Sequence, residues 1–556
     1  MPAEIRQIGL AVTHQRLMVL MLLFMMVTAV ITGKLGYFAV HGLMHNPAHA
    51  ASGFVPPRAD IVDRNGEVLA RDIDAWSIGI HPDALVNSPE ELAPKLAQLM
   101  PERTVAQYLQ ILRSHEKFTY LRRRALPELV AQVNALGEPA IEYLREPERL
   151  YPQTTLAAHV LGYTDFNGNG VAGMERALNA RLIDPAQRNT PVALSIDSRV
   201  QAILEAELSA GMMQQRALGA AGLVLDANTG EVLAMASLPV FNPNTSGQTS
   251  DDARRNNVTQ SVYELGSTFK PLTFANAIDT GTVTNIAKRW DATAPLHVGQ
   301  YTIHDDEPAN RWLNMPEALV HSSNIVTAQI ADQMGQQKTM SFFTRMHFNE
   351  PPRIELHEKG RPIWPKYWAR TTVMTIGFGH GMAVTPLQLA TGYAALANGG
   401  ILRAPTLLKL NPGEVPPGER VISASTSLLM RKMLRLVVLQ GTGERANVEG
   451  MRIGGKTGTA EVPGKHGYNK HANVSTFVGV FPLDAPRYVV LTMLDQPKGS
   501  AATGGVTTAG MVSAPIAGRV IARIGPMLGV LPDMNRDIDV SELMPLLWHP
   551  KTEANH

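Results

Sequence analysis

The sequence predicts an α+β fold for the larger part of the chain, with an antiparallel sheet at its centre. Two apolar runs with alternating side chains flank Asn228-Thr229-Gly230 and are typical of a strand pair. Helical patterns occupy the middle of the chain, and a strand pattern rich in small residues returns at residues 454–462. Strands and helices segregated along the chain in this way are typical of α+β domains.

Composition limits the possible functions. A chain of 556 residues with 45% hydrophobic residues can form two or more domains with large cores. It has no cysteine, which excludes disulfides and thiolate metal sites, and its net charge of +1 indicates no nucleic-acid partner. The densest histidine cluster, His304-Asp305-Asp306, lacks a second histidine at helical spacing and is expected to be an exposed loop.

An uncharged apolar run covers residues 17–33 and predicts a single transmembrane helix over residues 17–38. Arg6 and Arg16 precede the run and only Lys34 follows it closely, which favours a cytoplasmic N-terminus over residues 1–16. A cleaved signal peptide is the alternative, because Ala48-His49-Ala50 resembles a cleavage site. That site lies far beyond the end of the apolar core.

Residues 53–189 are predicted to form an N-terminal pedestal or interaction domain. Asn65-Gly66 between apolar runs predicts a hairpin, and helical patterns continue to about Leu136, with interruptions at Pro101 and Pro127. Nothing in this region brings a nucleophile together with a base.

A domain boundary is placed before a strand expected at residues 190–197, which leads into a helix at 200–208. The second domain covers residues 190–531. Residues 532–556 are interpreted as a C-terminal tail with one short amphipathic piece.

Ser267 and Lys270 form a Ser-x-x-Lys motif at a predicted helix start. Three residues correspond to about one helical turn, so the hydroxyl and the amine lie on one face. Pro271 is tolerated only in the first turn, which places Ser267 at or near the N-terminus of a helix that Thr280-Gly281 ends. A second copy, from Ser114 to Lys117, lacks companion motifs and is interpreted as a solvated helix.

Ser322-Ser323-Asn324 opens another helical run. An N-cap is the structural interpretation, since Ser and Asn commonly serve as caps. The functional interpretation gives the Ser322 hydroxyl a proton-relay role and the Asn324 amide a contact with substrate or lysine.

The third motif is Lys456-Thr457-Gly458-Thr459. Read from Gly450, it satisfies the phosphate-loop pattern, but no buried strand precedes it and no helix is expected after it. The alternative is a strand whose glycines allow an extended peptide to pair along it, with Lys456, Thr457 and Thr459 facing a carboxylate.

Together and in this order, the three motifs resemble those of the penicillin-recognising serine acyltransferases. The apolar span and further motifs make the chain similar to the class B penicillin-binding proteins over about residues 15–525. These further motifs are Asp63-Arg64-Asn65-Gly66, Gly170-Val171-Ala172-Gly173-Met174-Glu175, Gly377-Phe378-Gly379-His380-Gly381 and Thr385-Pro386-Leu387-Gln388. Arg58-Ala59-Asp60 departs from the Arg-Gly usual in the family, which affects the local turn only.

The resemblance implies a transmembrane helix, an elongated mixed α/β pedestal and a C-terminal transpeptidase domain whose antiparallel sheet is covered by helices. It implies a D,D-transpeptidase that cross-links septal peptidoglycan during cell division, with Ser267 as the nucleophile and Lys270 as its base. It gives Ser322, Asn324 and Lys456 catalytic roles, assigns substrate binding to Thr457, Gly458 and Thr459, and requires no metal or cofactor.

The implied partners are stem peptides ending in D-Ala-D-Ala, an acceptor amine, β-lactams, and division proteins that include a polytopic glycosyltransferase. The implied location is the bacterial inner membrane, with the catalytic domain in the periplasm. Three other functions share the motifs: a serine β-lactamase, a membrane-bound antibiotic sensor and a noncatalytic division scaffold.

Overall fold

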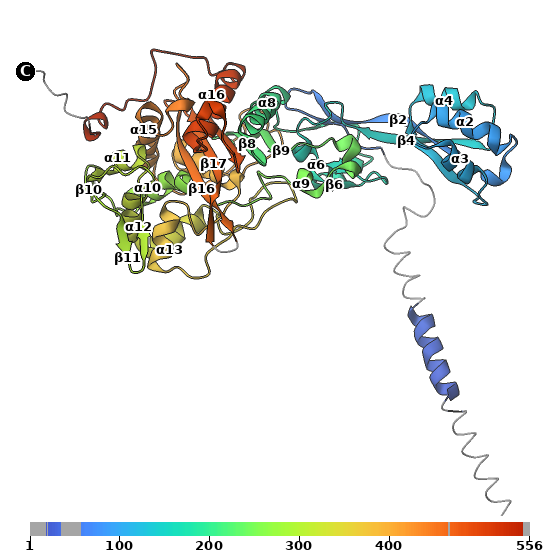
Figure 1. The fold of residues 1–556 in the computed structure, drawn as a ribbon, viewed down its shortest axis with the longest axis horizontal. Helices are drawn as coiled ribbons and strands as arrows, with labels where there is room; N and C mark the ends of the chain where they lie inside the picture. Colours follow the sequence, from blue (N-terminus) through green and yellow to red (C-terminus); the bar gives the residue numbers. More distant parts are fainter. Residues whose placement is uncertain (1–17, 19, 35–56, 465–466, 549–556) are drawn as a thin grey trace, which may run out of the picture. The chain divides into compact units, whose positions relative to one another are not determined.

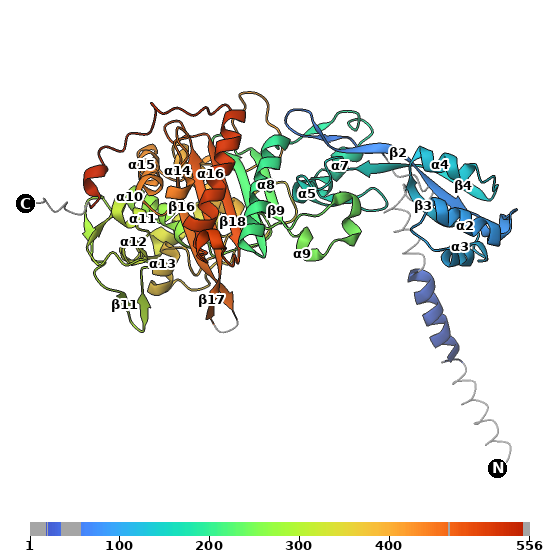
Figure 2. The ribbon, with the colours of Figure 1, turned by 45° about the horizontal axis from the view of Figure 1, so that its top comes forward.

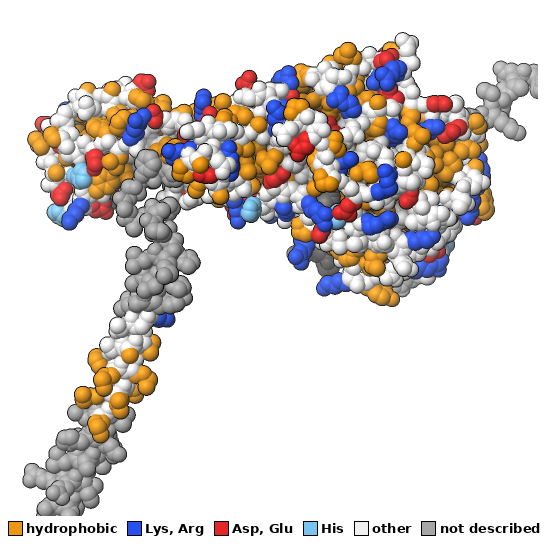
Figure 3. Space-filling model, turned by 180° about the vertical axis from the view of Figure 1, so that it is seen from behind, with side chains coloured by type: hydrophobic (Ala, Val, Ile, Leu, Met, Phe, Trp, Pro, Cys, Tyr) orange, Lys and Arg blue, Asp and Glu red, His pale blue; other side chains and the backbone are white. Residues whose placement is uncertain are grey.

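The computed structural model describes residues 18, 20–34, 57–464 and 467–548 (Figure 1). The chain divides into two compact units, Met1–Val55 and Pro56–His556. Within the first unit, the described residues from 18 to 34 are helical and expose apolar side chains (Figure 3). Among the described residues, no helix combines the length and apolarity needed to cross a membrane. The predicted cytoplasmic segment 1–16 and residues 17, 19 and 35–38 of the predicted span lie outside the described residues.

The first sheet of the second unit has the strand order β3-β2-β1-β7, and β4 also pairs with β2. Its strands are β1 (Ile61–Val62), β2 (Val68–Ile80), β3 (Thr119–Ala125), β4 (Ile141–Leu150) and β7 (Val192–Ala193). The predicted Asn65-Gly66 turn is confirmed, because β1 and β2 pair antiparallel across it and Gly66 has a φ of +93°. The strand expected at 190–197 is limited to β7, which runs parallel to β1.

Helices cover part of this sheet. They are α2 (Pro89–Leu99), α3 (Val105–Leu112) and α4 (Pro127–Asn134), which pack their apolar faces onto Ile78 and Ile80 of β2. The predicted helices are therefore confirmed, but β3 interrupts the expected helical region. Its Arg-rich sequence carries no strand pattern, and its pairing with β2 decides its conformation.

Ser114 lies in a turn after α3 and not in the solvated helix that the sequence indicated. The chain turns there to enter β3.

Buried charges connect the segments around the start of β1. Glu175 accepts hydrogen bonds from Arg58 Nε at 3.0 Å and from Arg149 Nε at 2.7 Å, and Asp72 accepts from Arg149 Nη1 at 3.1 Å. Ala59 has no left-handed φ, so the departure from the family's Arg-Gly causes no backbone strain. The smaller elements nearby are η1 (Pro82–Ala84), α5 (Ala158–Leu161), β5 (Tyr163–Thr164), β6 (Gly170–Ala172), α6 (Gly173–Ala177) and α7 (Asn179–Ile183).

The second sheet is the predicted antiparallel one, and its order is β16-β17-β18-β8-β9. Its strands are β8 (Gly219–Asp226), β9 (Val232–Leu238), β16 (Gly454–Gly464), β17 (Gly467–Phe481) and β18 (Tyr488–Asp495). The predicted hairpin of β8 and β9 is thus confirmed. Strand β16 forms an edge of the sheet.

Helices cover both faces of this sheet (Figures 1 and 2). Val224 and Val490 pack against α8 (Ser198–Gln215) and α16 (Ala509–Met527) on one face. Leu223 and Leu491 face the opposite core, which contains α14 (Pro386–Ala397). Neighbouring residues of one strand therefore pack into two different cores, because successive side chains of a strand point to opposite faces of the sheet.

The segment between β9 and β16 is mainly helical. Its longer helices are α10 (Lys270–Asp279), α11 (Met315–Val320), α12 (Asn324–Arg345), α13 (Arg370–Gly377) and α15 (Ala424–Gln440). The short elements here and after β18 are η2 (Pro243–Gln248), α9 (Asp251–Arg254), η3 (Gly266–Phe269), β10 (Arg289–Trp290), β11 (Leu296–Val298), β12 (Tyr301–Ile303), β13 (Leu313–Asn314), β14 (Ile401–Leu402), β15 (Glu419–Arg420), η4 (Glu444–Ala446), η5 (Ala501–Thr503) and η6 (Met544–Leu546).

The described part of the C-terminal segment packs against this helical region. Ile538, Leu543 and Leu547 are buried in its core, and Asp537 pairs with Arg435 at 2.6 Å. The described part of the tail contains the short element η6, and the amphipathic piece expected there stays a prediction.

Candidate active site

Ser267 lies in η3, the single turn that leads directly into α10. Pro271 stands in the first turn of α10, where its missing N–H leaves no helical hydrogen bond unmade, and Thr280 caps the other end. The prediction that Ser267 stands at a helix start is therefore confirmed. Ser267 lines a cleft of about 590 Å³, and its hydroxyl makes no hydrogen bond with the described residues.

Lys270, at the start of α10, is completely buried. Its Nζ donates to the backbone oxygen of Ser322 and lies 3.1 Å from Ser322 Oγ. Burial lowers the pKa of Lys270 to about 7, although the negative charges of Asp305 and Asp306 act in the opposite direction. A large fraction of this lysine is therefore a neutral amine near pH 7, which can accept a proton.

Ser322 adopts a left-handed backbone conformation, with a φ of +59°. This region costs a residue with a side chain about 1–2 kcal/mol. The turn places the Ser322 side chain next to Lys270 and leaves Ser323 as the N-cap of α12, where Ser323 Oγ accepts from Val326 N at 3.1 Å. The N-cap interpretation is therefore confirmed for Ser323, and the proton-relay role of Ser322 stays a prediction.

Hydrogen bonds also involve Asn324 and Asp305 near the turn at Ser322. Asn324 Nδ2 donates to the backbone oxygen of His304 at 2.9 Å, and it makes no hydrogen bond to Lys270. Asp305 is buried and accepts from Ser323 Oγ at 2.7 Å and from Ile325 N at 2.9 Å. The exposed loop expected at residues 304–306 is therefore wrong for Asp305, because its carboxylate satisfies polar groups at the start of α12.

Strand β16 carries the third motif beside the turn that contains Ser267. Lys456 is buried and its Nζ donates to Thr457 O at 3.0 Å, whereas Thr457 and Thr459 line the cleft. Burial, followed by the nearby charge of Lys270, lowers the pKa of Lys456 well below its ordinary value. The predicted strand is confirmed, and the phosphate-loop interpretation is wrong because this backbone is paired with β17.

Glycines allow β16 to approach the turn that carries Ser267. A Cβ at Gly458 would lie 2.4 Å from Leu265 O, and a Cβ at Gly266 would lie 3.0 Å from Thr459 O. Gly266 also has a φ of +53°. The backbones that flank Ser267 and Thr459 are therefore in direct contact.

A hydrogen-bonded cluster missed by the sequence analysis lies on the other side of this turn. Glu264 Oε2 accepts from the Tyr468 hydroxyl at 2.8 Å and lies 3.2 Å from His380 Nδ1. Gly379, in the glycine-rich motif that the family resemblance singled out, packs so closely on Gly266 that a Cβ would lie 2.0 Å from its oxygen. This glycine-rich motif was the sequence feature that could have indicated the cluster, but only the fold shows that the motif contacts Gly266.

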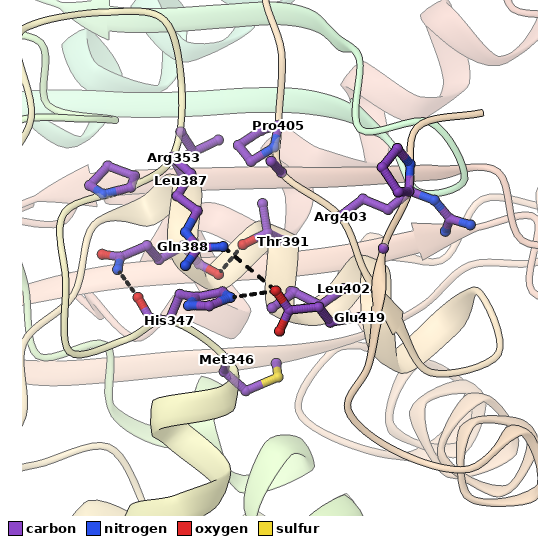
Figure 4. A pocket seen from close by; sticks show the side chains of 14 residues that line it. Met346, His347, Arg353, Leu387, Gln388, Thr391, Leu402, Arg403, Pro405 and Glu419 are labelled. Atoms are coloured by element: carbon purple, nitrogen blue, oxygen red, sulfur yellow. Dashed lines mark hydrogen bonds and ion pairs between the residues drawn. The ribbon is translucent and has the colours of Figure 1, made fainter. Parts of the chain in front are cut away.

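A separate cavity of about 250 Å³ shares no lining residue with the cleft (Figure 4). His347 projects into it and forms ion pairs with Glu350 at 2.9 Å and with Glu419 at 3.5 Å. It contains none of the predicted site residues.

Two family models match the chain. Residues 220–521 match the penicillin binding protein transpeptidase domain, and residues 54–182 match the penicillin-binding protein dimerisation domain. The first range lies within the second unit, and the second range begins two residues before that unit.

Curated relatives and a solved structure agree with these matches. The chain is 41% identical to a probable peptidoglycan D,D-transpeptidase FtsI of Caulobacter vibrioides, over 86% of this chain and 83% of the relative. It is 29% identical to the peptidoglycan D,D-transpeptidase FtsI of Escherichia coli K12, over 77% and 75% of the two chains. A crystal structure of penicillin binding protein 3 from Mycobacterium, complexed with aztreonam, shares the fold with a TM-score of 0.68 and 24% identity, over 86% of this chain and 98% of that one.

The match over the catalytic domain, the second match over the pedestal and the full-length relatives lead to one assignment: this chain belongs to the penicillin-binding proteins that combine a dimerisation domain with a transpeptidase domain.

Proposed function

We propose that this protein is a serine D,D-transpeptidase that cross-links peptidoglycan stem peptides through an acyl-enzyme and is inactivated by penicillins. The observation that carries the proposal is the Ser267 hydroxyl, which lines an open cleft without a hydrogen bond to the described residues, three positions before a buried lysine whose pKa is lowered to about 7. A lysine with this pKa is largely neutral near pH 7 and can serve as a general base.

In the acylation step, Lys270 accepts the Ser267 proton as the serine oxygen attacks the carbonyl of the penultimate D-alanine. The peptide C–N bond then breaks, and Ser322, hydrogen-bonded to Lys270, relays a proton to the leaving D-alanine amine. Backbone N–H groups of Ser267 and Thr459 stabilise the developing oxyanion, a contribution of about 3–4 kcal/mol per donor in enzymes of this kind.

Substrate orientation is assigned to strand β16 and to Asn324. Thr457 and Thr459 face the cleft and bind the terminal carboxylate. The Lys456 amine donates a hydrogen bond to the backbone oxygen of Thr457 and so holds this part of the strand in place. Gly458 keeps the strand close to the nucleophile. Asn324 orients the donor peptide from the start of α12.

The proposal also includes the place in the cell where the protein acts and the proteins with which it acts. The FtsI names of the relatives and the matched dimerisation domain support action at the division septum with division proteins, including a polytopic glycosyltransferase. The apolar run at residues 17–33 supports a single-pass anchor in the inner membrane, with a cytoplasmic N-terminus and a periplasmic catalytic domain. Intact mass of the membrane-extracted chain tests the anchor, and a mature chain beginning near Ala51 would contradict it.

Covalent labelling with a fluorescent penicillin tests the catalytic assignment. Wild-type protein and the S114A control should be labelled, whereas S267A should lose the label and keep its circular dichroism spectrum. Label retained on S267A would refute the role of Ser267.

The lifetime of the penicilloyl-enzyme separates this function from that of a β-lactamase. We expect an ester that persists for many minutes after free drug is removed, because a tenfold slower deacylation needs only about 1.4 kcal/mol of added barrier. Rapid return to the unmodified mass would favour a β-lactamase. Cross-linked product formed from peptidoglycan would exclude a sensor or a noncatalytic scaffold.

A further inference from the structure

Glu461 continues the row of β16 side chains that face the cleft. Side chains of a strand alternate between its two faces, and Thr457, Thr459 and Glu461 all line the 590 Å³ cleft. Alternate side chains are about 7 Å apart along a strand. Glu461 therefore stands beyond the oxyanion-binding end of the site, on the side away from the carboxylate-binding threonine Thr457.

The backbone changes immediately after this residue. Glu461 pairs with Asn473, but Val462 pairs with Asn469, so the ladder between β16 and β17 is interrupted at that point. Irregularities of this kind redirect side chains and occur often beside active sites.

Glu461 also lines a second cavity, of about 480 Å³. Tyr301, Phe378, His380 and Tyr468 contribute to its walls. The Glu461 charge contributes to a raised pKa of Tyr468, after burial and the hydrogen bond to Glu264. Glu461 is the residue that the two cavities have in common.

The Glu461 carboxylate is exposed and forms no hydrogen bond or ion pair with any described residue. Cross-linking, the function proposed above on which this inference rests, consumes a primary amine that is an ammonium ion at neutral pH. A free carboxylate accepts a charge-assisted hydrogen bond from such an ammonium group.

We propose that Glu461 binds an ammonium group of a stem peptide at the junction of the two cavities. Where this group is the acceptor amine, its binding raises the preference of the acyl-enzyme for amine over water. The ammonium group belongs either to the acceptor stem or to a side chain of the donor stem. In the transfer step the nitrogen forms the amide bond as the ester C–Oγ bond breaks. One nitrogen proton returns to Ser267, and the extra proton of the ammonium ion passes to solvent.

The acceptor arm of the test uses full-length protein acylated by a thioester donor without amines, with a diamino-acid peptide as acceptor. Product analysis by mass spectrometry gives the ratio of aminolysis to hydrolysis at subsaturating acceptor. In E461Q this ratio should fall about tenfold, which corresponds to about 1.4 kcal/mol, and E461D should restore part of it.

The donor arm compares a donor bearing a side-chain ammonium group with its N-acetylated counterpart. A loss of kcat/KM in E461Q confined to the ammonium-bearing donor would assign the bound group to the donor stem. An unchanged ratio of aminolysis to hydrolysis in the acceptor arm, together with an unchanged kcat/KM in the donor arm, would overturn the inference.

Glu307 provides a matched control, because it is an exposed carboxylate that lines the same cleft from another segment. E307Q should change the ratio less than twofold, and an effect equal to that of E461Q would overturn a specific role for Glu461. Benzylpenicillin acylation of E461Q should stay within twofold of wild type. If wild-type protein is not acylated by benzylpenicillin, the proposed function fails instead.

Discussion

Penicillin acylation of this protein should rise about tenfold between pH 6 and pH 8 and then level off. The reason is the buried amine of Lys270, which must be neutral to accept the Ser267 proton. With a pKa of about 7, it is about 10% neutral at pH 6 and about 90% neutral at pH 8.

The size of this effect follows from burial. Complete removal of Lys270 from water lowers its pKa from 10.5 to about 7, which corresponds to about 5 kcal/mol between the two protonation states. A solvated lysine would remain protonated, and the rate would instead rise about a hundredfold between pH 6 and pH 8 and continue to rise at pH 9.

The assay is the second-order rate constant for benzylpenicillin acylation, followed by intact mass or rapid quench from pH 5.5 to pH 9.5. Circular dichroism at each pH controls for unfolding. A rate that still rises tenfold between pH 8 and pH 9, or a rate independent of pH from 6 to 8, would refute the assignment of Lys270 as the base.

Three further outcomes are expected. D306N should move the midpoint of the acylation profile to lower pH, because the Asp306 charge raises the pKa of Lys270; a shift to higher pH would contradict this. G458A should slow acylation more than tenfold and lower the free energy of unfolding by about 1–3 kcal/mol, because the added Cβ would lie 2.4 Å from Leu265 O. Penicillin labelling measures the acylation rate, and urea unfolding measures the stability. E175Q should lower the free energy of unfolding by about 3–5 kcal/mol, because it leaves two buried arginines without a full counter-charge, and wild-type stability in urea would argue against this.

The local parts of the fold and site were determined by the sequence. Pro271, four residues after Ser267, predicts a helix start, and alternation around a turn predicts the β8–β9 hairpin. These features depend on residues that are neighbours in the chain, so their periodicity and turn chemistry are visible without a structure. The three motifs that contain Ser267, Ser322 and Lys456 were found in the same way.

Contacts between distant segments were decided only by the tertiary structure. Lys270 meets Ser322 across 52 residues, and Asp305 becomes buried because it satisfies polar groups at the start of α12. Strand β3 forms because it pairs with β2, although its own sequence carries no strand pattern. The pKa of Lys270 and the place of Glu461 between two cavities belong to this second class, because burial and cavity shape result from packing and not from local sequence.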